Sequence, residues 1–211
     1  MTSFKVKVCG ITRPEDAGTA CSLGADLIGV IFAKESPRCI GQERARAIFA
    51  AIPDDRGRVG VFVNEDVDAI LDVVAACGLD MVQLHGDESE IEIKLIKKNE
   101  VKVIKGFNIT SVADYDRPLK SAADYVLFDN RDKDRRGGTG KPFDWSLTPP
   151  QPIPNLVLAG GLSAENLASG VAKFKPQIVD VSSGVEVAPG IKSPEKLKTF
   201  FEECDRIRYG K

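Results

Sequence analysis

The sequence has little of several features that mark particular classes of protein. No uninterrupted apolar run is longer than seven residues, for example 27–33, whereas a membrane-spanning helix needs about 20. There is one histidine, and the five cysteines are widely spaced with no CxxC pair. A disulfide framework and a protein-built zinc site are therefore not expected. Because the N-terminus also lacks an apolar signal core, we expect free thiols and a cytoplasmic protein.

An excess of charge of one sign is also missing. Lysine and arginine total 29 and aspartate and glutamate total 31, for a net charge of -2. General binders of nucleic acid or anionic membranes are usually basic, so neither is an expected partner. Apolar residues make up 43% and charged residues 28%, which is typical of a folded globular protein. Since no linker-like change in composition divides the 211 residues, we expect a single domain over residues 1–211.

Short apolar segments alternate with amphipathic helical patterns along the whole chain, which predicts parallel strands joined by right-handed crossovers. The predicted strands cover residues 4–9, 26–32, 58–63, 80–85, 101–106, 124–129, 155–159 and 177–182. The predicted helices cover residues 14–23, 42–51, 67–77, 88–98, 111–122, 164–172 and 194–206. Eight such units close into a single-domain (β/α)8 TIM barrel, which is the α/β fold we expect. An open, doubly wound sheet is the alternative.

Reactive residues occur where the predicted strands end, and in a barrel these ends form the active face. Cys9 ends the first strand and shares a face with Lys7, so we expect its thiol to point into the mouth of the barrel. Asp129 ends the sixth strand. A cysteine in this place is often only a buried apolar residue, and an aspartate often only caps a loop. Together they form a candidate acid/base pair.

Two loops rich in glycine and serine follow the seventh and eighth strands. They contain Gly160 and Gly161 in the first loop, and Ser182, Ser183 and Gly184 in the second. Glycines let the backbone approach a ligand and direct successive N–H groups at it, and a following helix N-terminus adds partial positive charge. Each loop alone is a weak signal, but this pair of loops often binds phosphate in barrels. We therefore expect a phosphate site here.

Three further residues are candidates for binding substrate. Arg38 follows the second strand and is either a solvated loop charge or a fork for a substrate carboxylate. His85 ends the fourth strand, where a lone histidine is more often a structural hydrogen-bonding group than a ligand. Asp180 lies in the eighth strand below the loop that follows it. Residues 131–136 carry charges of both signs, and we interpret them as a solvated, mobile loop that could act as a lid.

These residues belong to stretches that resemble the phosphoribosylanthranilate isomerase family of tryptophan biosynthesis, in the family's order and over essentially the whole chain. The stretches are 7–12 (KVCGIT), 24–26 (GAD), 36–38 (SPR), 60–64 (GVFVN), 82–86 (VQLHG), the strand end at Asp129, 137–145 (GGTGKPFDW), 158–162 (LAGGL) and 179–186 (VDVSSGVE). One departure is Cys39, directly after Arg38, where an aromatic residue is expected in the wall of the anthranilate pocket.

The resemblance implies a (β/α)8 barrel and an Amadori rearrangement of a small substrate, without a metal or redox cofactor, by a monomer or homodimer. N-(5-phosphoribosyl)anthranilate would become 1-(2-carboxyphenylamino)-1-deoxyribulose 5-phosphate. It also implies that Asp129 is the general acid and Cys9 the general base. Arg38 would bind the anthranilate carboxylate, the two glycine-containing loops would bind the phosphate, and His85 would support the site.

Other functions remain open at this point. An indole-glycerol-phosphate synthase would be expected to have lysines at its strand ends and extra N-terminal residues. A pentose-phosphate epimerase would be expected to have several metal-binding histidines, and this chain has one. A non-catalytic protein that binds a phosphorylated ligand is a further alternative. A related aminoaldose of histidine biosynthesis is another possible substrate, although Arg38 favours the anthranilate compound.

Overall fold

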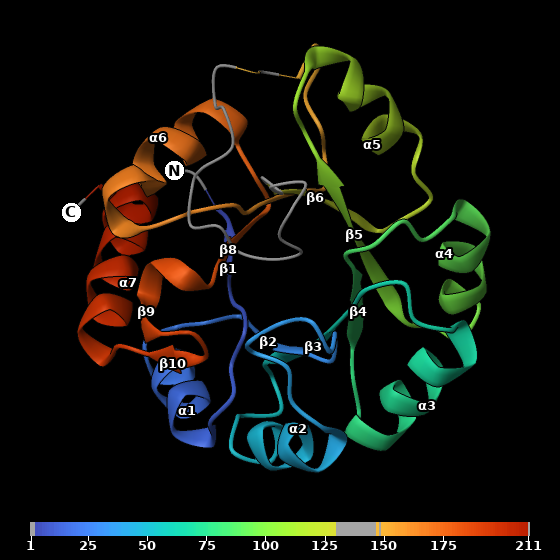
Figure 1. Ribbon diagram of the computed structural model, residues 1–211. Helices are drawn as coiled ribbons and strands as arrows, with labels where there is room; N and C mark the ends of the chain where they lie inside the picture. Colours follow the sequence, from blue (N-terminus) through green and yellow to red (C-terminus); the bar gives the residue numbers. More distant parts are fainter. Residues whose placement is uncertain (1–2, 130–146, 148, 211) are drawn as a thin grey trace.

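Eight parallel strands form a closed barrel in the computed structural model, which describes residues 3–129, 147 and 149–210 (Figure 1). Each strand pairs with the next along the chain, and the eighth pairs with the first, with Lys7 opposite Asp180. The strands are β1 (Lys5–Val8), β2 (Leu27–Ile31), β3 (Gly57–Phe62), β4 (Met81–Leu84), β5 (Lys102–Asn108), β6 (Tyr125–Asp129), β7 (Leu156–Leu158) and β8 (Ile178–Val181). The predicted (β/α)8 fold is confirmed, and the open sheet is wrong.

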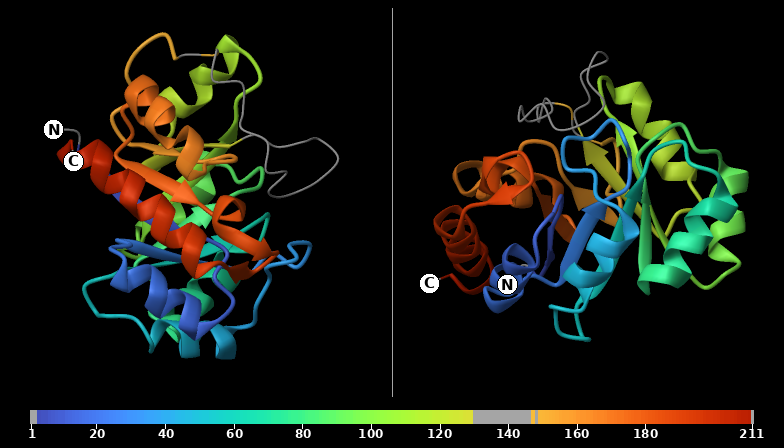
Figure 2. Two further views of the ribbon diagram at one scale, coloured as in Figure 1. Left: turned by 90° about the vertical axis from the view of Figure 1, so that its left-hand side faces the viewer. Right: turned by 60° about the horizontal axis from the view of Figure 1, so that its bottom comes forward.

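Helices surround the barrel on its outer side (Figures 1 and 2). They are α1 (Pro14–Ser22), α2 (Gln42–Phe49), α3 (Val67–Cys77), α4 (Glu90–Lys97), α5 (Asp116–Lys120), α6 (Ala164–Phe174) and α7 (Pro194–Tyr209). Local sequence sets several of their ends. The Asp66 side chain caps α3, and Ser89 with Glu92 forms a capping box on α4. Gly78 ends α3 in the left-handed conformation, with φ 62°.

The segment after β5 differs from the single helix predicted over residues 111–122. It consists of a 3-10 turn, η1 (Val112–Tyr115), followed by the short α5. Proline lacks an N–H group and its ring collides with the preceding turn, so Pro118 fits only the first turn of a helix. A helix that began at residue 112 would place Pro118 in its interior. The predicted charged loop at 131–136 and the stretch 137–145 lie outside the described residues.

A small antiparallel hairpin between β8 and α7 was not predicted. A 3-10 turn, η2 (Ser183–Val185), leads into β9 (Glu186–Ala188), which pairs with β10 (Ile191–Lys192). Gly190 makes the turn with φ 80°, a conformation that favours glycine. Glu186 and Lys192 are register partners in this hairpin. The strands are two and three residues long, too short to produce a recognisable alternating pattern in the sequence.

Side chains alternate across the barrel wall as predicted for β1. Val6 and Val8 join the large apolar core between the strands and the helices. The lower interior of the barrel holds a second apolar layer, made by Leu27, Val59, Met81, Ile104, Leu127, Val157, Ala159 and Ile178. Lys7, by contrast, is fully buried but makes polar contacts with side chains from β4 and β8. In the described part of the chain, no helix is long and apolar enough to cross a membrane.

Candidate active site

A cavity opens at the carboxyl ends of the strands. Nine of the ten predicted site residues line it, namely Cys9, Arg38, His85, Asp129, Gly160, Gly161, Asp180, Ser182 and Ser183. The tenth, Gly184, directly follows Ser183 and lies against the backbone of Leu162. These residues come from the ends of β1, β2, β4, β6, β7 and β8, which are far apart in the sequence. The closed barrel brings them together because parallel strands all end at the same face.

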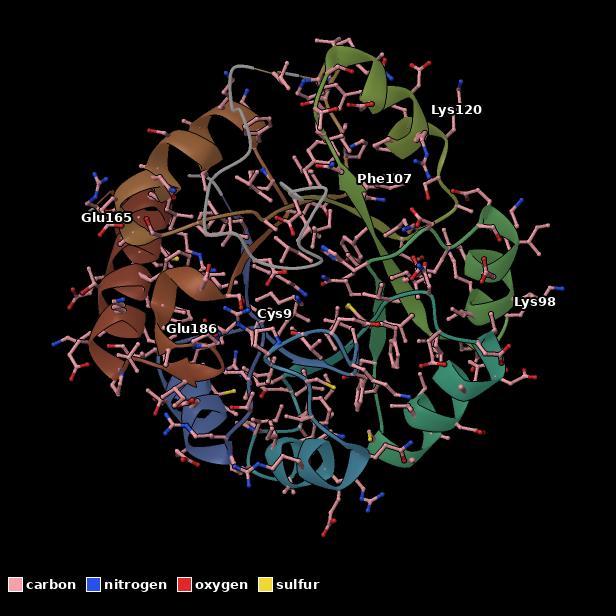
Figure 3. All side chains as sticks on the ribbon, in the orientation of Figure 1. Cys9, Lys98, Phe107, Lys120, Glu165 and Glu186 are labelled. Carbon is pink, nitrogen blue, oxygen red and sulfur yellow. The ribbon has the colours of Figure 1, made fainter. Side chains whose placement is uncertain are left out.

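Cys9 follows β1, where its N–H donates to the carbonyl of Val181 at 2.8 Å. Its label lies near the middle of the barrel in Figure 3. A Cβ at Gly29 on β2 would lie 2.9 Å from Sγ, so the glycine leaves room for the thiol. Burial raises the pKa of the Cys9 thiol, and nearby Lys7 opposes this rise. The thiol is therefore held protonated in the free protein.

Lys7 is the centre of a buried polar cluster below Cys9. Its Nζ donates to Asp180 Oδ2 and to Gln83 Oε1, both at 2.8 Å. Burial would lower the pKa of Lys7, but the attraction of the Asp180 carboxylate outweighs burial and raises the pKa above its ordinary value. Lys7 is therefore a cation. Asp180 Oδ1 is buried and has no hydrogen-bond partner among the described residues. This oxygen belongs to a side chain that lines the cavity, so it suits a hydrogen-bond donor on a ligand.

His85 bridges the fourth and sixth strands. Its Nε2 is 3.1 Å from Asp129 Oδ2, and its Nδ1 is 3.0 Å from Nε2 of Gln83. Both His85 and Asp129 are partly accessible from the cavity, with side chains 15% and 16% exposed. The carboxyl group of Asp129 thus contacts an imidazole and belongs to a side chain that lines the cavity. The thiol of Cys9 and the carboxyl of Asp129 line one shared cavity, as the sequence predicts.

Arg38 is part of a second buried cluster. Its Nε and Nη2 donate to the two carboxylate oxygens of Glu186, at 2.8 and 2.6 Å. Burial alone would raise the pKa of Glu186, but Arg38 and Lys192 outweigh burial and lower it, so Glu186 is ionised. Lys192 Nζ donates to Glu186 Oε1 at 2.8 Å and to the carbonyl of Cys9 at 2.6 Å. The hairpin thereby connects the guanidinium wall of the cavity to the backbone that carries the thiol.

The two predicted phosphate loops lie side by side at the ends of β7 and β8. Gly160 and Gly161 have φ values of 78° and 70°, in the left-handed region. Asn166 Nδ2 donates to the carbonyl of Gly161, and its Oδ1 accepts from the N–H of Ser163 at the start of α6. These contacts hold the first loop against a helix N-terminus. Backbone N–H groups in such a place favour an anion.

Sequence reasoning gave no role to Lys7, Gln83, Glu186 or Lys192, which hold the catalytic candidates in place. A signal was present for Lys7, because strand alternation places it on the same inward face as Cys9. Glu186 ends one of the stretches that carry the family resemblance, but its partner could not be read from that stretch. Among residues 3–129, 147 and 149–210, no group of three or more histidine, cysteine, aspartate or glutamate side chains could hold a metal ion.

A sequence model of the N-(5'-phosphoribosyl)anthranilate (PRA) isomerase family matches residues 6–203. The chain belongs to this family. A PRA isomerase from Citrifermentans bemidjiense is 42% identical over 208 residues, covering 96% of this chain and 98% of that protein. The PRA isomerase structure from Thermotoga maritima superimposes with a TM-score of 0.87 at 39% identity, covering 96% of this chain and 98% of that chain.

A second solved PRA isomerase holds a ligand. It is a complex with reduced 1-(o-carboxyphenylamino)-1-deoxyribulose 5-phosphate. The match has a TM-score of 0.83 at 38% identity and covers 96% of this chain and 98% of that chain. The resemblance seen in the sequence motifs is therefore confirmed at the level of the PRA isomerase family and of its barrel fold.

Proposed function

We propose that the chain is a PRA isomerase of tryptophan biosynthesis, an aldose–ketose isomerase that converts N-(5-phosphoribosyl)anthranilate to 1-(2-carboxyphenylamino)-1-deoxyribulose 5-phosphate. Family membership over residues 6–203 supports this activity. The single observation that carries the chemistry is the shared cavity of Cys9 and Asp129, with the two anion-binding loops on its rim. An acid and a base on one sugar are what an Amadori rearrangement needs, because the reaction only moves protons between neighbouring atoms.

The proposed mechanism gives each group one proton transfer. Asp129 donates its proton to the ring oxygen of the furanose, the bond from that oxygen to C1 breaks, and the nitrogen lone pair forms the iminium. Cys9, as thiolate, then removes the proton from C2, and the C–H electron pair neutralises the iminium to give an enolamine. Tautomerisation of the enolamine gives the ketone at C2. There is no net oxidation, so the proposal uses no metal or redox cofactor.

The remaining cavity residues are proposed to bind the two ends of the substrate. Gly160, Gly161 and the Ser182–Ser183–Gly184 loop hold the phosphate through backbone N–H groups. Arg38 binds the anthranilate carboxylate, and because Nε and Nη2 already face Glu186, the proposal assigns this contact to Nη1. Oδ1 of Asp180, which has no hydrogen-bond partner among the described residues, accepts a hydrogen bond from a sugar hydroxyl. His85 supports the site through Asp129.

We also propose that the 211 residues work as one domain, as a monomer or homodimer in the cytoplasm, without a nucleic-acid or membrane partner. The pairing of Lys7 with Asp180 supports a single domain, since it joins strands from opposite ends of the chain. All five cysteines are free, which supports a reducing compartment.

A fluorescence assay with the purified protein and freshly made phosphoribosylanthranilate tests the function directly. The expected result is loss of anthranilate-type fluorescence at a rate proportional to protein concentration. The aminoketose is identified by its ketone, with a mass unchanged from that of the substrate. A protein that binds the substrate or a stable analogue but does not turn it over would instead be a non-catalytic binding protein. Equal turnover of the histidine-pathway aminoaldose would show a broader substrate range.

A further inference from the structure

A chain of hydrogen bonds crosses the interior of the barrel from β1 to β6. It starts at the Lys7 ammonium, which is also ion-paired with Asp180. Lys7 Nζ lies 2.8 Å from Gln83 Oε1, and Gln83 Nε2 lies 3.0 Å from His85 Nδ1. His85 Nε2 lies 3.1 Å from Asp129 Oδ2. The chain thus joins a buried cation to the proposed general acid.

The chemistry of each group decides which atom donates. An ammonium group has only donors, so the Gln83 amide must present its oxygen to Lys7. The amide nitrogen of Gln83 then faces His85 and has only donors as well, so Nδ1 of the imidazole must accept. A neutral imidazole with its lone pair on Nδ1 has its proton on Nε2. The Nε2–H group therefore donates to Oδ2 of Asp129.

We propose that Gln83 is a positioning residue that holds His85 as the neutral Nε2–H tautomer, so that the Nε2–H group holds the carboxyl of Asp129 through Oδ2. A carboxyl group held in this way presents the proton that goes to the sugar in one orientation. The inference rests on the proposed function only for this last step, the delivery to substrate.

Burial argues that this chain serves the site and not only the fold. Gln83 is 3% exposed and Lys7 is fully buried. Polar and charged groups in such places destabilise a core unless every partner is present. Met81, two residues before Gln83 on the same strand face, belongs to the apolar layer that fills the barrel below. Apolar side chains therefore suffice to fill the interior. The hydrogen-bonded chain from Lys7 to Asp129 instead fixes which nitrogen of His85 carries its proton.

The histidine tautomer can be measured without substrate, because His85 is the sole histidine of the chain. Untagged protein labelled with 15N-histidine gives one imidazole spin system in a long-range 1H–15N correlation spectrum. The expected pattern at pH 7.5 is that of the Nε2–H tautomer. An Nδ1–H pattern, an imidazolium pattern or an equal mixture of tautomers in the unmodified protein would overturn the inference.

The variant Gln83→Glu reverses the hydrogen-bond requirement at Nδ1. A carboxylate in this position accepts from Lys7 and from the imidazole, so Nδ1 should become protonated. We expect the spectrum to lose the Nε2–H tautomer and kcat to fall about tenfold or more, with KM changed by less than about threefold. Met81→Leu is the matched control on the same strand face, and it should leave the spectrum and kcat unchanged. Unaltered kcat in a Gln83→Glu protein with an altered tautomer would refute the role.

Gln83→Met provides a second variant of similar size without hydrogen-bonding groups. It should give a mixture of tautomers and a kcat between those of the unmodified protein and Gln83→Glu. Should Gln83→Glu fail to fold, this variant and the unmodified protein still decide the inference. The two proposals fail differently. If the unmodified protein does not turn over phosphoribosylanthranilate, the function is wrong, whereas normal turnover with the wrong tautomer refutes only the role of Gln83.

Discussion

Arg38 and Glu186 form a bidentate ion pair in the wall of the cavity, with N–O distances of 2.8 and 2.6 Å, although 148 residues separate them in the chain. Both side chains are buried, at 9% and 5% exposed. Lys192 forms a second ion pair with Glu186, so the carboxylate still has a cationic partner when Arg38 is replaced. The pair fixes two of the guanidinium nitrogens and so restricts how Arg38 can meet a ligand.

Replacing Arg38 should therefore affect substrate binding more than chemistry. For Arg38→Ala we expect KM to rise about tenfold or more with kcat changed by less than about threefold, because carboxylate binding is the same in the ground state and the transition state. Glu186→Gln should raise KM by a smaller factor. Arg206→Ala is the matched control, since Arg206 forms an exposed bidentate pair with Glu203 on α7. Steady-state kinetics that give an unchanged KM for Arg38→Ala would rule out the carboxylate contact.

Removal of the Cys9 thiol should remove the proposed general base. For Cys9→Ala we expect kcat to fall about 10²-fold or more, because a general base contributes on that order, while a product analogue still binds. Cys77→Ala, at a buried thiol on α3 outside the cavity, serves as the control. The measurements are stopped-flow fluorescence for turnover and calorimetry for binding. Near-normal turnover by Cys9→Ala would remove the thiol from the mechanism.

Replacing Asp129, the proposed general acid, should change the shape of the pH profile as well as the rate. In the proposed mechanism the thiolate of Cys9 is the base, and burial raises the pKa of this thiol above its ordinary value of 9.0. Asp129→Asn lacks the proposed acid, so its kcat/KM should be lower by about 10²-fold and should rise with pH as the Cys9 thiol ionises. The unmodified protein has both groups and should show a different pH profile over the same range. The same profile in both proteins would contradict the assignment.

The close approach of the two proposed phosphate loops depends on Gly184. A Cβ at this position would overlap the carbonyl oxygen of Leu162, on the loop after β7. The neighbouring atoms belong to the backbone of Leu162 and Ser163, so no flexible side chain can move away to make room. Gly184→Ala should push the loops apart and raise KM about tenfold or more, with a weaker affinity for inorganic phosphate as a competitive inhibitor. The control is Gly18→Ala on α1, where an added Cβ meets nothing within 4 Å. Equal inhibition of both variants by phosphate would show that the loops do not bind it.

The buried thiol of Cys204 should make the fold less stable at alkaline pH. Burial in α7 raises its pKa from 9.0 to about 12. The contribution of the buried thiol to the free energy of unfolding is therefore complete below pH 9. It is lost as the pH rises from 9 towards 12, because in this range the Cys204 thiol ionises only in the unfolded chain. At pH 10.5 this ionisation should lower the free energy of unfolding by about 2 kcal/mol. Urea unfolding in reducing buffer at pH 7.5 and 10.5 should show this loss in the unmodified protein, relative to Cys204→Ala. The same pH dependence in both proteins would refute it.

Much of the barrel could be predicted because its local signals are strong. The eight strands were placed within about two residues of their observed ends, and α3 was placed at its observed limits, since Asp66 and Gly78 mark both ends. The prediction was wrong where a local signal was overlooked, as at Pro118 in the segment split between η1 and α5. It was also incomplete at β9 and β10, whose few residues carry no periodic pattern.

The sequence by itself determined the order of elements and the residue types at the ends of the strands. These follow from periodicity, from turn residues and from the rule that parallel strands of a barrel end at one face. Only the tertiary structure decided which polar side chains pair, such as Arg38 with Glu186, Lys7 with Asp180, and His85 with Asp129. Such pairs join residues 44 to 173 positions apart. Their strength depends on distances of about 3 Å and on burial, which exist only once the barrel has closed.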